Sequence, residues 1–172
     1  MFKIDVITKE RAEGELKIAF KTIERIMGFV PPHFELFGTL DLEGLKKFTK
    51  ESILLQRDEK IDARILPILR LIIAKKECRR YCIEFNTKLL EKDFGKDFVK
   101  EPLDTLSKLS LAEEQKILVR KIAKAIYDSE NFTKEDIEEL YNLGFDDKEF
   151  FKILSYCVRF MANSKMIDIY LS

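Results

Sequence analysis

Apolar residues recur along the chain at the spacing of helix faces, and no alternating strand pattern competes with that spacing. It predicts a first helix over about Glu10 to Met27. Gly28 and the Pro31-Pro32 pair end this helix, because proline cannot continue it. A second, amphipathic helix is predicted over about Leu42 to Gln56. The N-terminal part is therefore expected to be helical around one proline turn.

The middle of the chain combines an apolar helix with an amphipathic one. A helix is predicted over Ile65–Lys76, and its segment Ile65–Ala74 is apolar almost all round. A helix that is apolar on every side is buried, so we expect this one to be the central and most buried helix of a bundle. The next helix is predicted over about Tyr81 to Lys92. Cys78 and Cys82 lie at the junction of the two helices.

Start and stop signals divide the C-terminal half into three helices. Ser110 and Glu113 have the spacing of a capping box that opens the first. Thr133 and Asp136 open a second, short helix, which Gly144 closes as a left-handed cap.

Asp146 is expected to cap the third and longest of these helices. The apolar face of the first is predicted to comprise Leu111, Leu118, Ile122 and Ile126. The inward face of the last is predicted to comprise Phe150, Leu154, Cys157, Val158 and Met161. The fold class expected from these patterns is all-α.

The size and charge of the chain narrow the possible classes of function. A length of 172 residues suits one domain, so we expect residues 1–172 to form a single helical domain. Lys plus Arg and Asp plus Glu are equal at 31 each, which gives no overall attraction to nucleic acid or to an anionic membrane. The first ten residues lack the apolar core of a secretory signal, and the longest apolar run is too short to span a bilayer. We therefore expect a cytoplasmic protein that binds neither partner.

The stretch around the first two cysteines is basic. The thiolate is the nucleophilic form of cysteine, and nearby cations or a helix N-terminus favour it. Cys82 would then resolve a sulfenic acid or mixed disulfide formed on Cys78. The basic residues that flank Cys78 are Lys75, Lys76, Arg79 and Arg80. This pattern indicates thiol redox chemistry.

The spacing of the two cysteines leaves a second interpretation open. Three residues separate them, so in an unbroken helix they differ by about 6 Å in rise, near the upper end of the separations that a disulfide spans. Closure therefore needs local unwinding, which a helix junction can supply. The alternative is two buried, inert thiols on one helix face, the usual fate of a free cysteine.

A metal or cofactor site has less support in the sequence. Zinc prefers four cysteine or histidine ligands, but the single histidine, His33, follows the proline turn and is expected to be a solvated loop residue. Cys157 is expected in the core. Neither a phosphate-binding glycine loop nor a dinucleotide motif is present. We expect no cofactor.

With these elements in place, the chain resembles the alkyl hydroperoxidase D (AhpD)-like branch of the carboxymuconolactone decarboxylase family. The resemblance is carried by the turn Gly28–Pro32, the run RRYCIEFNTKLL and the C-terminal segment that ends in KMIDIYL, and it covers about Gly28 to Leu171. It implies an AhpD-like helical bundle, assembled as a trimer or hexamer. It also implies reduction of peroxides or of a partner protein's disulfide through a cysteine pair.

The family pairs its Cys-x-x-Cys motif with a glutamate and a histidine that relay protons. Cys82 matches the second cysteine. Cys78 matches the first with one residue inserted between them, and without an insertion Arg79 takes that place. Asn86 stands at the histidine position and cannot exchange a proton near neutral pH. The glutamate position falls at Leu66 or Pro67, and neither is an acid or a base.

Two glutamates lie close to the cysteine pair in sequence. Glu77 adjoins Cys78 and is the better substitute for the missing relay, whereas Glu84 projects to another side of its helix from Cys82. The expected function is an AhpD-like thiol–disulfide or peroxide redox activity that cycles Cys78 and Cys82, with a possible redox partner protein. The alternative is a catalytically inactive, oligomeric binding or scaffold protein of the same fold. Decarboxylation of a lactone acid lacks any acid–base set.

Overall fold

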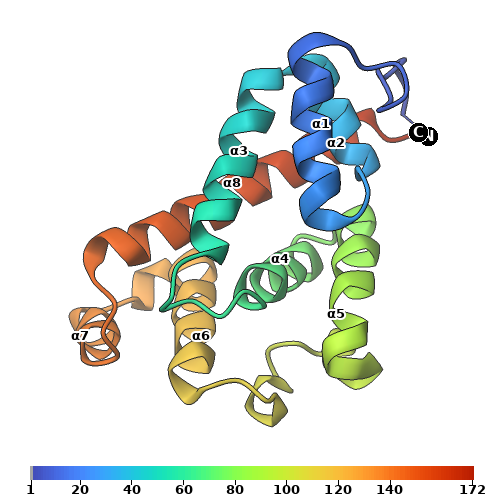
Figure 1. The fold of residues 1–172 in the computed structure, drawn as a ribbon. Coiled ribbons are helices and arrows are strands. Elements are labelled where there is room, and N and C mark those ends of the chain that lie inside the picture. The colour runs from blue at the N-terminus through green and yellow to red at the C-terminus, as the bar shows by residue number, and fades with distance from the viewer. Residues whose placement is uncertain (1) are drawn as a thin grey trace. The chain divides into compact units, whose positions relative to one another are not determined.

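The computed structural model describes residues 2–172, and these are helical over most of their length (Figure 1). The α-helices are α1 (Gly14–Met27), α2 (Pro32–Leu40), α3 (Leu42–Gln56), α4 (Ile65–Lys76), α5 (Arg80–Lys100), α6 (Glu113–Tyr127), α7 (Lys134–Asn142) and α8 (Asp147–Tyr170). Among the described residues, the β-type pairing is one isolated bridge between Phe2 and Leu171. The predicted all-α class is confirmed.

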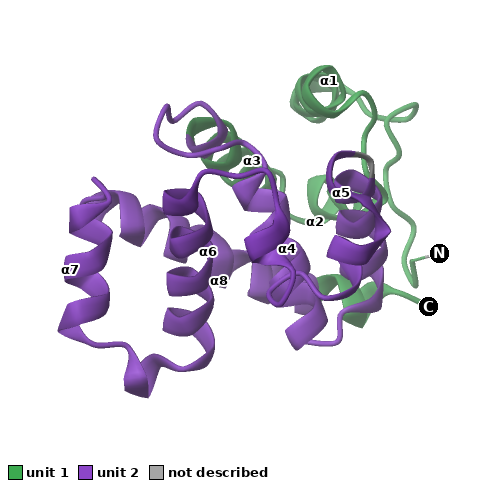
Figure 2. Ribbon diagram, turned by 90° about the horizontal axis from the view of Figure 1, so that it is seen from below, with its two compact units in different colours: residues 1–54, 166–172 green, residues 55–165 purple. Residues whose placement is uncertain are grey.

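The chain divides into two compact units (Figure 2). Of the described residues, 2–54 and 166–172 form unit 1, which contains α1, α2 and most of α3. Residues 55–165 form unit 2, which contains α4 to α7 and most of α8. The single-domain organisation stays a prediction. No described helix is both long and apolar enough to cross a membrane.

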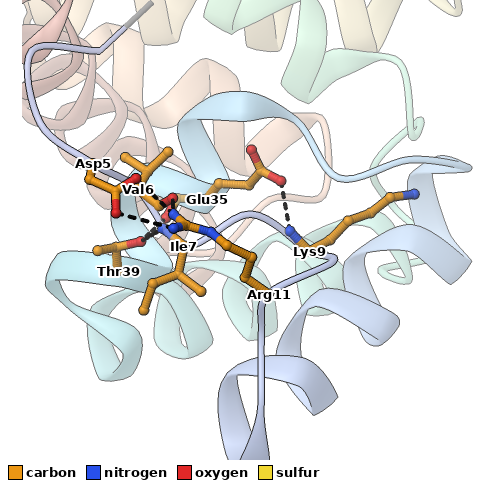
Figure 3. A network of polar contacts seen from close by, with 7 residues as sticks. All are labelled: Asp5, Val6, Ile7, Lys9, Arg11, Glu35 and Thr39. Carbon is orange, nitrogen blue, oxygen red and sulfur yellow. Dashed lines mark hydrogen bonds and ion pairs between the residues drawn. The ribbon is translucent and has the colours of Figure 1, made fainter.

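In unit 1, a network of polar contacts fixes the segment that precedes α1 (Figure 3). The Ile7 N–H donates to Oγ1 of Thr39 at 2.8 Å, and the Lys9 N–H donates to Oε1 of Glu35 at 2.9 Å. The Arg11 N–H closes a turn, so α1 begins at Gly14, four residues later than predicted. Its end at Gly28 is as predicted.

His33 is not the solvated loop residue that the sequence suggested. Pro32 opens α2, a position where the missing N–H of proline costs nothing. His33 therefore lies in the first turn of this helix, buried, with its ring 4.4 Å from the ring of Phe34.

In unit 2, α4 is the central helix, as predicted. Eight of its twelve residues are buried, and it packs against α5 and α6. Pro67 lies in its first turn, where an N–H has no partner within the helix. The two neighbours depart from the predicted boundaries: α5 runs on to Lys100 across a kink at Gly95, and α6 has no capping box, because its N-cap is Ala112 rather than Ser110.

The last two helices begin as predicted. At α7, the Thr133 N–H donates to Oδ2 of Asp136 at 2.8 Å. At α8, the N–H groups of Asp146 and Glu149 each donate to the other residue's carboxylate, at 2.8 and 2.7 Å. The inward face of α8 is rotated relative to the prediction. It comprises Ile153, Tyr156, Cys157 and Phe160, whereas Val158 is 52% exposed.

Candidate functional site

Cys78 occupies a strained backbone position immediately after α4. The N–H of Arg79 donates to the Ala74 carbonyl at 2.8 Å, and the N–H of Cys78 donates to the Lys75 carbonyl at 3.1 Å. These two bonds form a Schellman motif, in which the residue at the Cys78 position is left-handed and is usually glycine. Cys78 has a φ of 55°, and its side chain is exposed.

The end of α7 shows the same motif with the usual residue. There the N–H of Phe145 donates to the Leu140 carbonyl at 3.0 Å, the N–H of Gly144 donates to the Tyr141 carbonyl at 2.9 Å, and Gly144 has a φ of 87°. Among residues 2–172, Cys78 is the one non-glycine residue with a positive φ. The left-handed conformation costs an L-residue about 1–2 kcal/mol, so the fold is less stable with cysteine at this position than it could be.

Cys82 lies in the first turn of α5 and is only 3% exposed. The amide of Asn86, one turn later, donates through Nδ2 to the Cys82 carbonyl at 2.8 Å. Asn86 is itself 1% exposed and accepts a hydrogen bond at Oδ1 from Nε of Arg70 at 2.8 Å. Asn86, which stands where the resemblance predicted a histidine, is thus committed to structural hydrogen bonds.

Arg70 joins three helices around Cys82. Besides its bond to Asn86 on α5, this α4 residue donates through Nη1 to the hydroxyl of Tyr156 on α8 at 2.6 Å. Both acceptors are neutral, and both are buried. The positive charge also acts on Cys157, where it opposes the effect of burial on the thiol.

The basic residues around Cys78 are more strongly partnered than the sequence suggested. Arg79 pairs with Glu77 at 3.4 Å, and exposed Arg80 pairs with Glu84 at 3.1 Å, one turn along α5. Lys75 donates to the Lys100 carbonyl at 2.6 Å. The two glutamates offset both arginine charges. The cationic environment predicted to activate the Cys78 thiol is therefore weaker than a count of its basic neighbours implies.

A tyrosine from α6 joins the group around Cys78. The hydroxyl of Tyr127 is buried and makes no hydrogen bond of ideal geometry within the described residues, and the Glu77 carboxylate is the acceptor that acts on it. Burial raises the pKa of this hydroxyl well above its usual range, and the nearby Glu77 carboxylate raises it further. No sequence pattern pointed to Tyr127, which reads as the last residue of an amphipathic helix.

The remaining candidates fall outside this group. Cys157 is buried as predicted, and burial raises the pKa of its thiol to about 12. Across residues 2–172, no set of three or more histidine, cysteine, aspartate or glutamate side chains is arranged to hold a metal ion. The structure places Cys78 in the junction between α4 and α5 and Cys82 in the first turn of α5; neither is in a disulfide, and the first is exposed while the second is buried.

Neither the known protein-family models nor the curated proteins contain a match to this sequence. Solved structures do match. An uncharacterized peroxidase-related protein from Silicibacter sp. TM1040 has a TM-score of 0.73 at 15% identity, over 98% of this chain and 89% of that one. An alkylhydroperoxidase AhpD core protein, also described as uncharacterized and peroxidase-related, from Ralstonia eutropha JMP134 has a TM-score of 0.70 at 16% identity, over 98% and 90%. The chain therefore has the AhpD-like helical fold that its cysteine-bearing and C-terminal segments predicted.

Proposed function

We propose that the protein is a thiol-dependent peroxidase or disulfide reductase of the AhpD-like type, which cycles Cys78 and Cys82 between dithiol and disulfide. The conformation of Cys78 carries this proposal. A cysteine occupies a left-handed, exposed position where the equivalent turn of α7 has glycine. Strained positions of this kind cluster at functional sites. The fold shared with peroxidase-related proteins supports the same chemistry.

With a hydroperoxide as substrate, the Cys78 thiolate attacks the terminal oxygen. The O–O bond breaks, the alcohol leaves with a proton, and Cys78 becomes a sulfenic acid. The Cys82 thiol then attacks the Cys78 sulfur, a disulfide forms, and the sulfenic oxygen leaves as water with the proton of Cys82. A dithiol reductant returns the pair to its starting state and becomes a disulfide itself.

Formation of the disulfide requires the start of α5 to move. Cys82 is the third residue of the helix and is buried, while Cys78 is exposed. Loss of the first turn of α5 would release Cys82 toward Cys78. This movement costs the burial of Cys82 itself, but Arg80 and Tyr81, the α5 residues that precede it, are not buried.

The test is oxidation of the purified protein by tert-butyl hydroperoxide, read by peptide mass spectrometry. We expect a Cys78–Cys82 disulfide, loss of oxidation in Cys78→Ser, and a sulfenic acid that dimedone traps in Cys82→Ser. Cys157→Ser is the matched control and keeps the disulfide. If the peptide that contains both cysteines stays reduced in excess hydroperoxide, the proposal is wrong.

The second candidate is a catalytically inactive protein of the same fold that binds partners as a homo-oligomer. Asn86 and the apolar Leu66 favour it, because neither residue can supply the family's proton relay and both are buried. The exposure of Phe151 and Val158 on α8, at 69% and 52%, also favours an interface. Thiols that do not react with hydroperoxide, in a protein that is oligomeric in solution, would select this candidate.

A further inference from the structure

The helix-end turn of α4 contains an acidic residue, Glu77, immediately before Cys78 in the chain. Glu77 is the C-cap of α4, and its N–H donates to the Ile73 carbonyl at 2.9 Å. Since the turn also fixes the backbone of Cys78, neither residue can move far without breaking it. The side chain of Glu77 is 28% exposed, so its carboxylate lies at the boundary between the core and solvent.

Packing of α6 on α4 places Tyr127 beside this carboxylate. The hydroxyl of Tyr127 is sealed from solvent and makes no hydrogen bond of ideal geometry within the described residues, while the Glu77 carboxylate acts on it as an acceptor. A buried hydroxyl depends on such an acceptor, because leaving it without one is costly. The contact of Arg79 with the Glu77 carboxylate is long, at 3.4 Å, so Arg79 leaves this carboxylate able to accept from Tyr127 as well.

We propose that Glu77 carries the proton in the reaction of Cys78 with a hydroperoxide and that Tyr127 positions the Glu77 carboxylate for this step. The inference rests on the proposed function and supplies the relay that Asn86 cannot provide. The thiol of Cys78 gives its proton to Glu77, and the thiolate attacks the peroxide. As the O–O bond breaks, Glu77 gives the same proton to the departing alkoxide. One proton moves from sulfur to oxygen, and Glu77 ends as it began.

The raised pKa of Tyr127 suits the positioning role. Because burial and the Glu77 charge keep its hydroxyl protonated, Tyr127 remains a hydrogen-bond donor at neutral pH. It does not give up its proton during the reaction. Arg79 approaches the same carboxylate as a second donor.

Reagents whose leaving groups differ in their need for a proton can show whether Glu77 transfers a proton or only supports the structure. An alkoxide from tert-butyl hydroperoxide needs a proton as it leaves. Acetate from peracetic acid and iodide from iodoacetamide do not. We expect Glu77→Gln to slow oxidation of Cys78 by tert-butyl hydroperoxide about 100-fold, the usual size of a lost acid–base group. Its reactions with peracetic acid and iodoacetamide should change by less than about threefold, since solvent can take up the thiol proton and neither leaving group needs one.

Tyr127→Phe should show the same selectivity with a smaller loss, because Glu77 remains. The matched control is Tyr141→Phe. Tyr141 is an exposed residue of α7 whose hydroxyl donates to Asp147 at the start of α8, so its loss should leave all three rates unchanged.

Equal slowing by all three reagents, or no slowing, would overturn the relay while leaving the proposed function intact. Wild-type protein that does not react with tert-butyl hydroperoxide would overturn both. If Glu77→Gln does not fold, the selectivity of Tyr127→Phe decides.

Discussion

Replacing Cys78 with glycine should stabilise the protein, whereas replacing it with alanine should not. Both substitutions remove an exposed side chain, and both keep the two N–H donors that close the α4 turn, at 2.8 and 3.1 Å. They differ in how easily they adopt the φ of 55° at this position. The difference in unfolding free energy between the two variants therefore isolates the cost of the left-handed conformation.

The size of the effect follows from two opposing terms. Relief of the left-handed strain favours glycine by about 1–2 kcal/mol. The greater conformational freedom of glycine in the unfolded chain favours unfolding, and so disfavours the glycine variant by about 0.4–1 kcal/mol. We expect Cys78→Gly to be more stable than Cys78→Ala by on the order of 1 kcal/mol, or about 2–4 °C in Tm for a chain of this size.

Gly144→Ala provides the control in the opposite direction. Gly144 occupies the same position of the same motif with a φ of 87°, and a Cβ built there meets no atom within 4 Å. Its replacement should therefore cost a similar amount for conformational reasons alone. Urea unfolding at neutral pH under reducing conditions measures all three variants, with the midpoint shifting while the m-value stays constant.

One outcome would refute the reasoning. If Gly144→Ala loses about 1 kcal/mol while the glycine and alanine variants at Cys78 are equally stable, Cys78 is not strained. The argument that a functional constraint keeps cysteine at this position would then fail, although the redox proposal could still be tested chemically.

Three further predictions concern reactivity, pH and assembly. Iodoacetamide should label Cys78 faster than Cys157 at neutral pH, because Cys78 is exposed and Cys157 is buried with a raised pKa; equal slow labelling in a mass-spectrometric time course would show that Cys78 is inert. The folded-state pKa of Cys157, about 12, lies above its usual value of 9.0. The contribution of this buried thiol to the unfolding free energy is therefore complete below pH 9 and is lost as the pH rises toward 12. Unfolding followed by circular dichroism should show that Cys157→Val loses less stability than wild type over this range. Light scattering should report a homo-oligomer that Phe151→Glu with Val158→Glu dissociates; a wild-type monomer of about 20 kDa would contradict this.

The helices that sequence predicted best are those with unambiguous ends. The bounds of α3 and α4 match the prediction, because a helix that starts after a turn and ends at a change of polarity leaves few alternatives. The capping-box spacing of Ser110 and Glu113 wrongly predicted the start of α6. The spacing does not determine where the backbone enters the helix, and the N-cap is Ala112, two residues after Ser110. On α8, Ile153 and Phe160 are as apolar as the residues chosen for the inward face, so only packing could decide its rotation.

The candidate site was predictable only as far as its residues are close in sequence. Cys78 and Cys82 stand out because basic residues surround them. The left-handed conformation of Cys78 could not be predicted from the sequence, since that position of the turn is normally occupied by glycine. Tyr127 and Tyr156 reach the site from α6 and α8, and Tyr156 lies 86 positions from its partner Arg70. Only the packing of α4 against its neighbours brings such residues together.

Asn86 and Arg70 together explain why a histidine proton relay would be incompatible with the surroundings of Cys82. An imidazole at the Asn86 position would lie beside the Arg70 guanidinium, which now donates to the asparagine amide at 2.8 Å. A nearby positive charge disfavours the protonated form of histidine, so this position could not readily take up a proton. The neutral amide instead satisfies Arg70 on one side and the Cys82 carbonyl on the other. The proton relay proposed for the cysteine pair is therefore assigned to the C-cap of α4, where Glu77 lies beside Tyr127.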